Sequence, residues 1–140
     1  MNAISGEKCD TAWLVSDMPY ERKKELKEIF LGTKETSSNS ENPQYPYGDY
    51  FVRFGGEDLD AFTDRIYDAV REIAREDAGE TILIVTHGMA MRRFLKAVSY
   101  QQDGTGFIGN CGIVQFQYEE DTFEVRKIIN LQELHKILIF

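Results

Sequence analysis

The stretch ETILIVTHGMAMRRFLKAV, residues 80–98, decides the fold because it predicts a buried strand that runs into a helix. Residues 82–85 form a continuous apolar run between a turn and Gly88, which is typical of a strand buried on both faces of an α/β sheet. Residues 89–100 have a helical pattern. His87 therefore stands where the strand ends, and the sequence leaves open whether this histidine is structural or does chemistry.

The rest of the chain supplies further elements around this strand. Apolar residues recur every three or four positions over 58–76, which predicts a helix against one face of the sheet. Residues 112–130 alternate between apolar and polar on both sides of an acidic turn, which predicts an antiparallel hairpin. Short helices are expected over 9–16 and in the tail after Asn130. Together these patterns predict a three-layer α/β fold, with a mostly parallel sheet flanked by helices and a C-terminal hairpin.

Length and charge limit the classes of protein to consider. A chain of 140 residues fits one domain, residues 1–140, and its net charge of −8 disfavours nucleic acid as a partner. No apolar run approaches the roughly 18–20 residues that a membrane span needs, and the N-terminus lacks a secretory pattern, so we expect no membrane association and a cytoplasmic location. Two distant cysteines and two histidines give no metal-ligand spacing, so we expect no metal and no cofactor.

Residues 33–54 form a long segment that we call the lid. Its first eighteen residues, TKETSSNSENPQYPYGDY, hold two of the three prolines and many polar residues, which is typical of a loop. Loops of that length inside a domain are usually functional or disordered. Tyr45, Tyr47 and Tyr50 favour an ordered lid that contacts a substrate, because a disordered linker carries few aromatic residues.

His87 has two readings from its position alone. The carboxyl ends of strands in an open α/β sheet collect reactive groups, and the following helix presents its N–H groups there, so His87 and Gly88 are candidate phosphate-binding residues. Gly88 would let the backbone turn and let a ligand approach. The alternative is a structural histidine that is hydrogen-bonded to a neighbouring loop.

Several motifs carry a resemblance that bears on this choice. The segment ETILIVTHGMAMRRFL resembles the second histidine motif of the histidine phosphatase superfamily, the phosphoglycerate mutase-like proteins. ELKEIFLGTKE (25–35), FGGEDLDAFTDR (54–65) and NCGIVQFQYEEDTFEVRKIIN (110–130) are similar to further family segments and follow in the family's order. The resemblance covers residues 5–130 and implies a partial phosphoglycerate mutase-like fold.

The resemblance also implies a chemistry. Family members transfer the phosphoryl group of a small phosphorylated metabolite to a histidine within an Arg-His-Gly tripeptide, without a metal, and then to water or another hydroxyl. Glu28 matches the carboxylate that protonates the leaving oxygen, and His87 matches the histidine that stabilises the transferring phosphoryl group. Without the resemblance, Glu28 reads as a solvated acid in a charge-rich segment.

One part of the family pattern is missing from these 140 residues. No Arg-His-Gly occurs, since His87 follows a threonine and His135 follows a leucine, and Glu7 stands where a phosphate-binding arginine would fall. We therefore predict that the chain alone is inactive, because no phosphohistidine can form. Three explanations stay open: an incomplete domain of a longer enzyme, a non-catalytic pseudo-phosphatase with a binding role, or a chain completed by a partner.

The missing tripeptide also implies a missing strand. In the family that strand lies in the middle of the parallel sheet, next to the strand that precedes His87. An apolar strand left at an edge invites pairing with another chain, so we expect a homo-oligomer rather than a stable monomer. The apolar tail KILIF, residues 136–140, is the segment most prone to take part.

Overall fold

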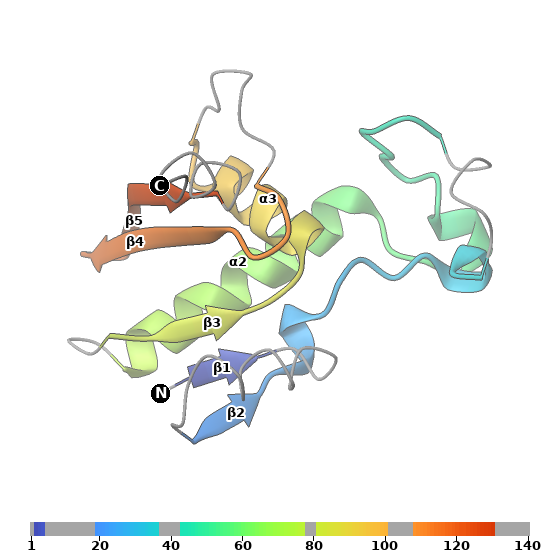
Figure 1. Ribbon diagram of the computed structural model, residues 1–140. Helices are drawn as coiled ribbons and strands as arrows, with labels where there is room; N and C mark the ends of the chain where they lie inside the picture. The colour runs from blue at the N-terminus through green and yellow to red at the C-terminus, as the bar shows by residue number, and fades with distance from the viewer. Residues whose placement is uncertain (1, 5–18, 37–42, 78–80, 101–107, 131–140) are drawn as a thin grey trace, which may run out of the picture.

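The computed structural model describes residues 2–4, 19–36, 43–77, 81–100 and 108–130 (Figure 1). The elements in these ranges form two sheets, two α-helices and three 3-10 helices. They are β1 (Asn2–Ile4), β2 (Tyr20–Arg22), η2 (Lys24–Leu26), η3 (Gly32–Lys34), η5 (Val52–Phe54), α2 (Leu59–Glu76), β3 (Leu83–Val85), α3 (Gly88–Ala97), β4 (Ile113–Glu119) and β5 (Thr122–Ile129). The predicted helix over 9–16 and the tail after Asn130 lie outside the described residues.

Helix α2 confirms the helix predicted over 58–76. Its N-cap is Asp58, whose carboxylate accepts hydrogen bonds from the backbone N–H groups of Asp60 and Ala61 at 2.9 and 3.1 Å. Such a cap satisfies donors that the first turn leaves without a partner in the helix. The apolar residues at three- and four-residue spacing form one buried stripe, which contains Leu59, Phe62, Ile66, Ala69 and Ile73.

Strand β3 and helix α3 confirm the central strand-to-helix unit, with a shorter helix than the pattern predicted. The helix ends at Ala97 because Ser99 adopts a left-handed φ of 58°. The N–H of Tyr100 then donates to the carbonyl of Leu95 at 3.0 Å, a bond that closes helix ends of this kind. At the other end, the hydroxyl of Thr86 donates to the carbonyl of Leu26 at 2.8 Å and fixes the end of β3 to η2.

The parallel sheet has the strand order β2-β1-β3. Strand β1, which the sequence did not predict, pairs in parallel with both of its neighbours, and Ala3 lies opposite Glu21 on one side and Ile84 on the other. One edge of β3 is therefore paired within the chain. Among the strands that the structure describes, β3 comes last in the order of this sheet.

Strands β4 and β5 form the predicted hairpin as a separate antiparallel sheet. Glu120 and Asp121 make the turn with φ values of 46° and 62°, the left-handed pair that two-residue hairpins prefer. The Asp121 carboxylate accepts hydrogen bonds from Arg71 and Arg75 of α2, which attaches the turn to the helix. These two arginines and Tyr118 lower the pKa of Asp121 well below its usual range.

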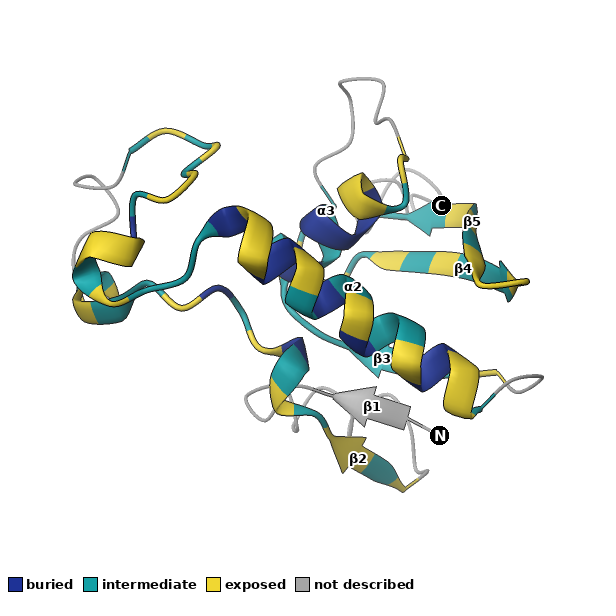
Figure 2. Cartoon of the chain, turned by 180° about the vertical axis from the view of Figure 1, so that it is seen from behind, coloured by how far each residue is buried: buried dark blue, intermediate teal, exposed yellow. Residues whose placement is uncertain are grey.

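Helices α2 and α3 lie on one side of the two sheets, and the buried residues of α2 face the strands (Figure 2). Two hydrophobic clusters fill this interface. The first cluster is centred on Phe62, Ile66 and Phe94 and includes Phe116 and Phe123 of the hairpin. The second cluster contains Leu26, Ala69 and Ile73 with the half-buried Ile82 and Ile84. The described residues thus confirm an α/β fold in which these two helices pack against the strands.

The lid starts and ends at a close crossing of the chain. A Cβ atom added to Gly32, whose φ is 64°, would lie 2.0 Å from the carbonyl oxygen of Phe54, and one added to Gly56 would lie 2.6 Å from that of Phe30. The N–H of Glu57 donates to the same Phe30 carbonyl at 2.8 Å. Glycine is therefore required at both positions because two backbones meet there.

Candidate active site

Glu28 and His87 meet at the carboxyl end of β3, although 59 positions separate them in the sequence. The Glu28 Oε2 atom accepts a hydrogen bond of 3.2 Å from the backbone N–H of Met89, in the first turn of α3. The Glu28 Oε1 atom accepts one of 3.0 Å from the N–H of Ile29. His87 occupies the N-cap position of the same helix, so the Glu28 carboxylate contacts a backbone N–H two residues after His87.

The Glu28 carboxylate takes the role that an N-cap side chain usually has. The side chain of His87 makes no capping hydrogen bond, and its backbone is extended, with φ −103° and ψ 164°. The positive end of a helix dipole favours an anion, which the carboxylate supplies here. The first turn of α3 therefore already binds one carboxylate, that of Glu28, which follows η2 in the chain. The half-buried side chain of His87 belongs to the same end of the helix.

Gly88 is exposed at the start of α3, and the space in front of it is open. A Cβ atom added there would meet no atom within 4 Å, and its φ is not positive. Neither a tight turn nor close packing requires glycine at this position. The open space in front of Gly88 leaves room for a ligand atom to approach the helix end beside His87.

An ion pair between Glu57 and Arg65 holds the Glu28 segment in place. The Arg65 guanidinium donates to both Glu57 oxygens at 2.8 Å and to the backbone carbonyls of Glu25, Lys27 and Glu28. The Glu57 Oε2 atom also accepts the N–H of Phe30 at 2.9 Å. We call this network the Glu57–Arg65 clamp. It fixes the backbone on both sides of Glu28 and so determines where the carboxylate points.

The clamp also sets the ionisation of Glu57. Burial alone would raise the pKa of its carboxyl group, but hydrogen bonds from Arg65 and from the Phe30 N–H outweigh burial and leave the pKa below its usual 4.5. Sequence analysis quoted both residues within the segment 54–65 but assigned them no role. Helical spacing could not have paired them, because Glu57 precedes the N-cap Asp58 and lies outside α2.

A buried arginine links the lid to the two helices. Arg93 is 2% exposed and donates to the hydroxyl of Thr63, to the hydroxyl of Tyr45 at 3.1 Å and to the carboxylate of Asp60 at 3.0 Å. The guanidinium of Arg92 lies 4.0 Å from the centre of the Tyr45 ring. Sequence analysis assigned no role to these two arginines. The structure shows that they hold Tyr45 against α3.

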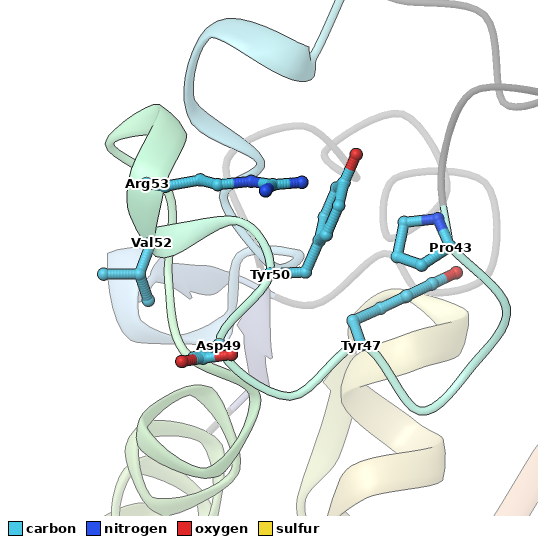
Figure 3. Close-up of a pocket in the computed structure, with 6 residues that line it drawn as sticks. All are labelled: Pro43, Tyr47, Asp49, Tyr50, Val52 and Arg53. Carbon is cyan, nitrogen blue, oxygen red and sulfur yellow. The ribbon is translucent and has the colours of Figure 1, made fainter.

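Tyr47 and Tyr50 belong to a different part of the lid. They line an open cavity of about 610 Å³ together with Pro43, Asp49, Val52 and Arg53 (Figure 3). The Arg53 guanidinium lies 4.3 Å from the centre of the Tyr50 ring, and Phe51 packs beneath both tyrosines without solvent exposure. Neither Glu28 nor His87 lines this cavity. The structure therefore brings Tyr45 to α3 but places Tyr47 and Tyr50 around a separate hollow.

The described residues place a carboxylate, that of Glu28, and an imidazole, that of His87, at the start of one helix. A carboxylate at a helix end can serve as proton donor, and an imidazole with nearby N–H groups can stabilise phosphoryl oxygens. Within the described ranges, no cluster of three or more His, Cys, Asp or Glu side chains is placed to hold a metal ion, and no helix there is long and apolar enough to cross a membrane.

Comparison with known proteins shows which proteins the sequence and the fold resemble. One stretch of 59 residues is 34% identical to the metal-independent phosphoserine phosphatase of Arabidopsis thaliana and covers 42% of this chain but only 24% of that protein. The fold is similar to that of Bacillus stearothermophilus YhfR, with a TM-score of 0.70, 23% identity, and coverage of 89% of this chain and 70% of that one. It is also similar to a phosphoglycerate mutase from Bacillus anthracis str. Sterne, with a TM-score of 0.74, 21% identity, and coverage of 97% and 75%.

A family model matches most of the sequence. Residues 8–131 match the model described as the histidine phosphatase superfamily, branch 1. The matched range contains Glu28, His87 and the hairpin. The chain therefore belongs to the histidine phosphatase superfamily.

Proposed function

We propose that this chain provides the proton-donating and phosphate-binding half of a phosphoryl-transfer site for a small phosphorylated metabolite. The observation that carries the proposal is the Glu28 carboxylate, held on the N–H of Met89 next to His87. A carboxyl group and an imidazole at one helix N-terminus match the demands of an anionic, oxygen-rich transition state. The nucleophilic histidine has to come from another polypeptide segment.

The reaction assigns a distinct part to each group. The incoming histidine nitrogen forms a bond to phosphorus while the bond from phosphorus to the ester oxygen breaks. Glu28, in its protonated form, gives its proton to that leaving oxygen. His87 donates a hydrogen bond to a phosphoryl oxygen and stabilises its charge. Water then attacks the phosphorus of the phosphohistidine, the bond from phosphorus to the histidine nitrogen breaks, and the carboxylate of Glu28 takes up the proton that water releases.

A second function is a non-catalytic module that binds an anion or another protein. One observation favours it: the only histidines are His87 and His135, and neither belongs to an Arg-His-Gly tripeptide. Such a module would keep the helix end and the imidazole for binding but would turn over no substrate.

The first experiment tests catalysis by the chain alone. We expect no turnover of p-nitrophenyl phosphate in EDTA between mildly acid and neutral pH, because no phosphohistidine can form. Turnover that disappears in His87→Ala would show that the chain is a complete enzyme and would contradict the two-part proposal.

The second experiment tests the phosphate-binding half. We expect inorganic phosphate to shift the amide NMR signals of Gly88 and Met89, with an affinity that His87→Ala lowers by about tenfold, the effect of losing roughly one charge-assisted hydrogen bond. Lys96→Ala, an exposed position at the other end of α3, is the control and should leave the affinity unchanged. If phosphate shifts neither amide signal, or if both variants bind equally well, the proposed phosphate site is wrong.

A further inference from the structure

Arg92 is a half-buried arginine of α3 whose guanidinium has no acidic partner in the part of the chain that the structure describes. Its contact there is with the ring of Tyr45, whose centre lies 4.0 Å from the guanidinium carbon. Five other described arginines donate hydrogen bonds to oxygen atoms: Arg65, Arg71, Arg75, Arg93 and Arg126. In a chain with 24 acidic and 16 basic residues, a half-buried cation without a carboxylate is unexpected.

The next residue in the helix, Arg93, shows how the two arginines divide their contacts. The Arg93 guanidinium donates to the carboxylate of Asp60 at 3.0 Å and to the hydroxyl of Tyr45 at 3.1 Å. Its charge is therefore matched, and Tyr45 is already fixed to α3 through its hydroxyl. Arg92 adds a contact with the face of the same ring. A guanidinium that stacks on a ring keeps its N–H groups in its own plane, where they can bind an anion.

Arg92 lies one helical turn after Gly88, on the same face of α3. Side chains at this spacing are neighbours, with about 5–6 Å between their Cβ positions, and they lean toward the N-terminus of the helix. The space in front of Gly88 is open, because a Cβ atom added there would meet no atom within 4 Å. The side chain of Arg92 therefore borders the space into which the proposed function places the phosphoryl group.

We infer that Arg92 binds a second anionic group of the phosphorylated metabolite and so determines which metabolites the site accepts. The inference rests on the proposed function for the position of the phosphoryl group at the first turn of α3. The second anion then lies about one helical turn, roughly 5–6 Å, from the phosphoryl group. The substrates are small phosphate esters that carry a carboxylate or a second phosphate a few bonds away. Esters with a neutral end leave the guanidinium without an acceptor and bind more weakly.

Tyr45 takes part in this recognition as a positioning residue. Its ring fixes the plane of the Arg92 guanidinium, and Arg93 in turn fixes the ring through the hydroxyl. A guanidinium held in one plane offers two parallel N–H donors to an anion and loses less conformational freedom when it binds. The lid therefore acts on the site through the orientation of Arg92.

The test uses the full chain and three phosphonates, which are not hydrolysed and share the same phosphorus group. Phosphonopropionate ends in a carboxylate, ethylene diphosphonate ends in a second phosphonate, and propylphosphonate ends in a methyl group. In NMR titrations, the amide signals of Gly88 and Met89 report the shared phosphonate end, and the side-chain Nε–H signal of Arg92 reports the second anion. We expect phosphonopropionate to bind about tenfold more tightly than propylphosphonate, because it adds a charge-assisted hydrogen bond.

Variants of the chain assign this difference to one side chain. Arg92→Met removes the charge but keeps a long side chain, so it should weaken binding of phosphonopropionate about tenfold and leave that of propylphosphonate unchanged. Arg92→Lys keeps the charge without the planar fork and should restore part of the difference.

Arg53→Met is the matched control. The guanidinium of Arg53 also stacks on a tyrosine ring, that of Tyr50 at 4.3 Å, and has no acidic partner among the described residues. It belongs to the cavity of the lid that neither Glu28 nor His87 lines (Figure 3). This variant should bind all three compounds as the parent chain does.

The outcomes separate this inference from the proposed function. Equal affinities for phosphonopropionate and propylphosphonate, or equal losses in Arg92→Met and Arg53→Met, would overturn the role of Arg92, while shifts of Gly88 and Met89 would still support the phosphate site. Signals of Gly88 and Met89 that stay in place with all three compounds would refute the phosphate site, and the class of two-anion substrates with it. Tighter binding of phosphonopropionate than of the diphosphonate would support a carboxylate as the second group, and the reverse would support a phosphate.

Discussion

The two hydrophobic clusters along α2 differ in size and in what they hold. The first cluster surrounds Phe94, whose ring lies 5.0 to 6.1 Å from those of Tyr67, Phe116 and Phe123. The second cluster has no aromatic ring and is partly open to solvent at Ile84. Both candidate catalytic residues follow the second cluster closely in the chain. The aromatic cluster therefore supplies most of the stability, and the smaller one positions the site.

The largest expected effect is the loss of the ring at the centre of the first cluster. Phe94→Ala should lower the free energy of unfolding by about 3–5 kcal/mol, because it removes buried contacts with both the helices and the hairpin. Ile73→Val, in the second cluster, should cost about 0.5–1.5 kcal/mol. Urea unfolding followed by circular dichroism measures both. Equal losses of unfolding free energy in the two variants would contradict the conclusion that the aromatic cluster contributes more stability than the smaller one.

The Glu57–Arg65 clamp is expected to have the next largest effect. Arg65→Met should cost about 2–3 kcal/mol, since it leaves the partly buried Glu57 carboxylate and several carbonyls without their donor. Freed from the clamp, the Glu28 segment should also shift, and the amide NMR signal of Met89 should move with it. Arg71→Met is the control, because Asp121 keeps its hydrogen bonds from Arg75. A Met89 signal that stays in place would mean that the clamp does not position Glu28.

Acid should reduce the contribution of the Glu57–Arg65 clamp to the stability of the fold. The pKa of Glu57 in the folded chain lies below its ordinary 4.5, so the unfolded chain binds this proton first as the pH falls. The stabilisation is present above pH 4.5 and is lost at lower pH. We expect Glu57→Gln to be less stable near neutral pH and to lose less stability on acidification than the parent chain. Parallel stability curves for the two proteins below pH 4.5 would contradict this assignment.

The smallest expected effect is at the exposed glycine of the site. Gly88→Ala should raise the free energy of unfolding by less than about 1 kcal/mol, because alanine favours helix and meets no atom there. Gly56→Ala is the matched contrast and should cost about 1–3 kcal/mol, since its Cβ atom would collide with the Phe30 carbonyl. A similar loss for both would mean that the helix end is more crowded than the structure shows.

Elements that depend on local patterns could be predicted from the sequence. Helix α2, strand β3 and the hairpin each have a periodic apolar pattern and a stop signal within a few residues. Strand β1 was missed because it has only three residues in a polar context and is defined by its pairing with Leu83, 81 positions away. Pairing over such a distance leaves no local signal in a single sequence.

The site follows the same rule. Glu28 stands in a charge-rich segment, and only the resemblance to a family singled it out, because its bond to the N–H of Met89 spans 61 positions. Arg93 was not predicted to be buried, because a pair of arginines in a sequence does not show which of them faces the core. Contacts that form only when distant segments fold together are therefore visible in the structure and not in the pattern.

The crossing of the chain at Gly32 and Gly56 also has a meaning for how such proteins diversify. Because the two backbones are in contact there, the segment between them is a closed loop, and its length does not affect the distance between its ends. Insertions and deletions inside it cost little, since the entropy of closing a loop grows slowly with its length. Evolution can therefore replace the whole loop as one module without moving Glu28 or His87. The new loop must again supply a partner for Arg93.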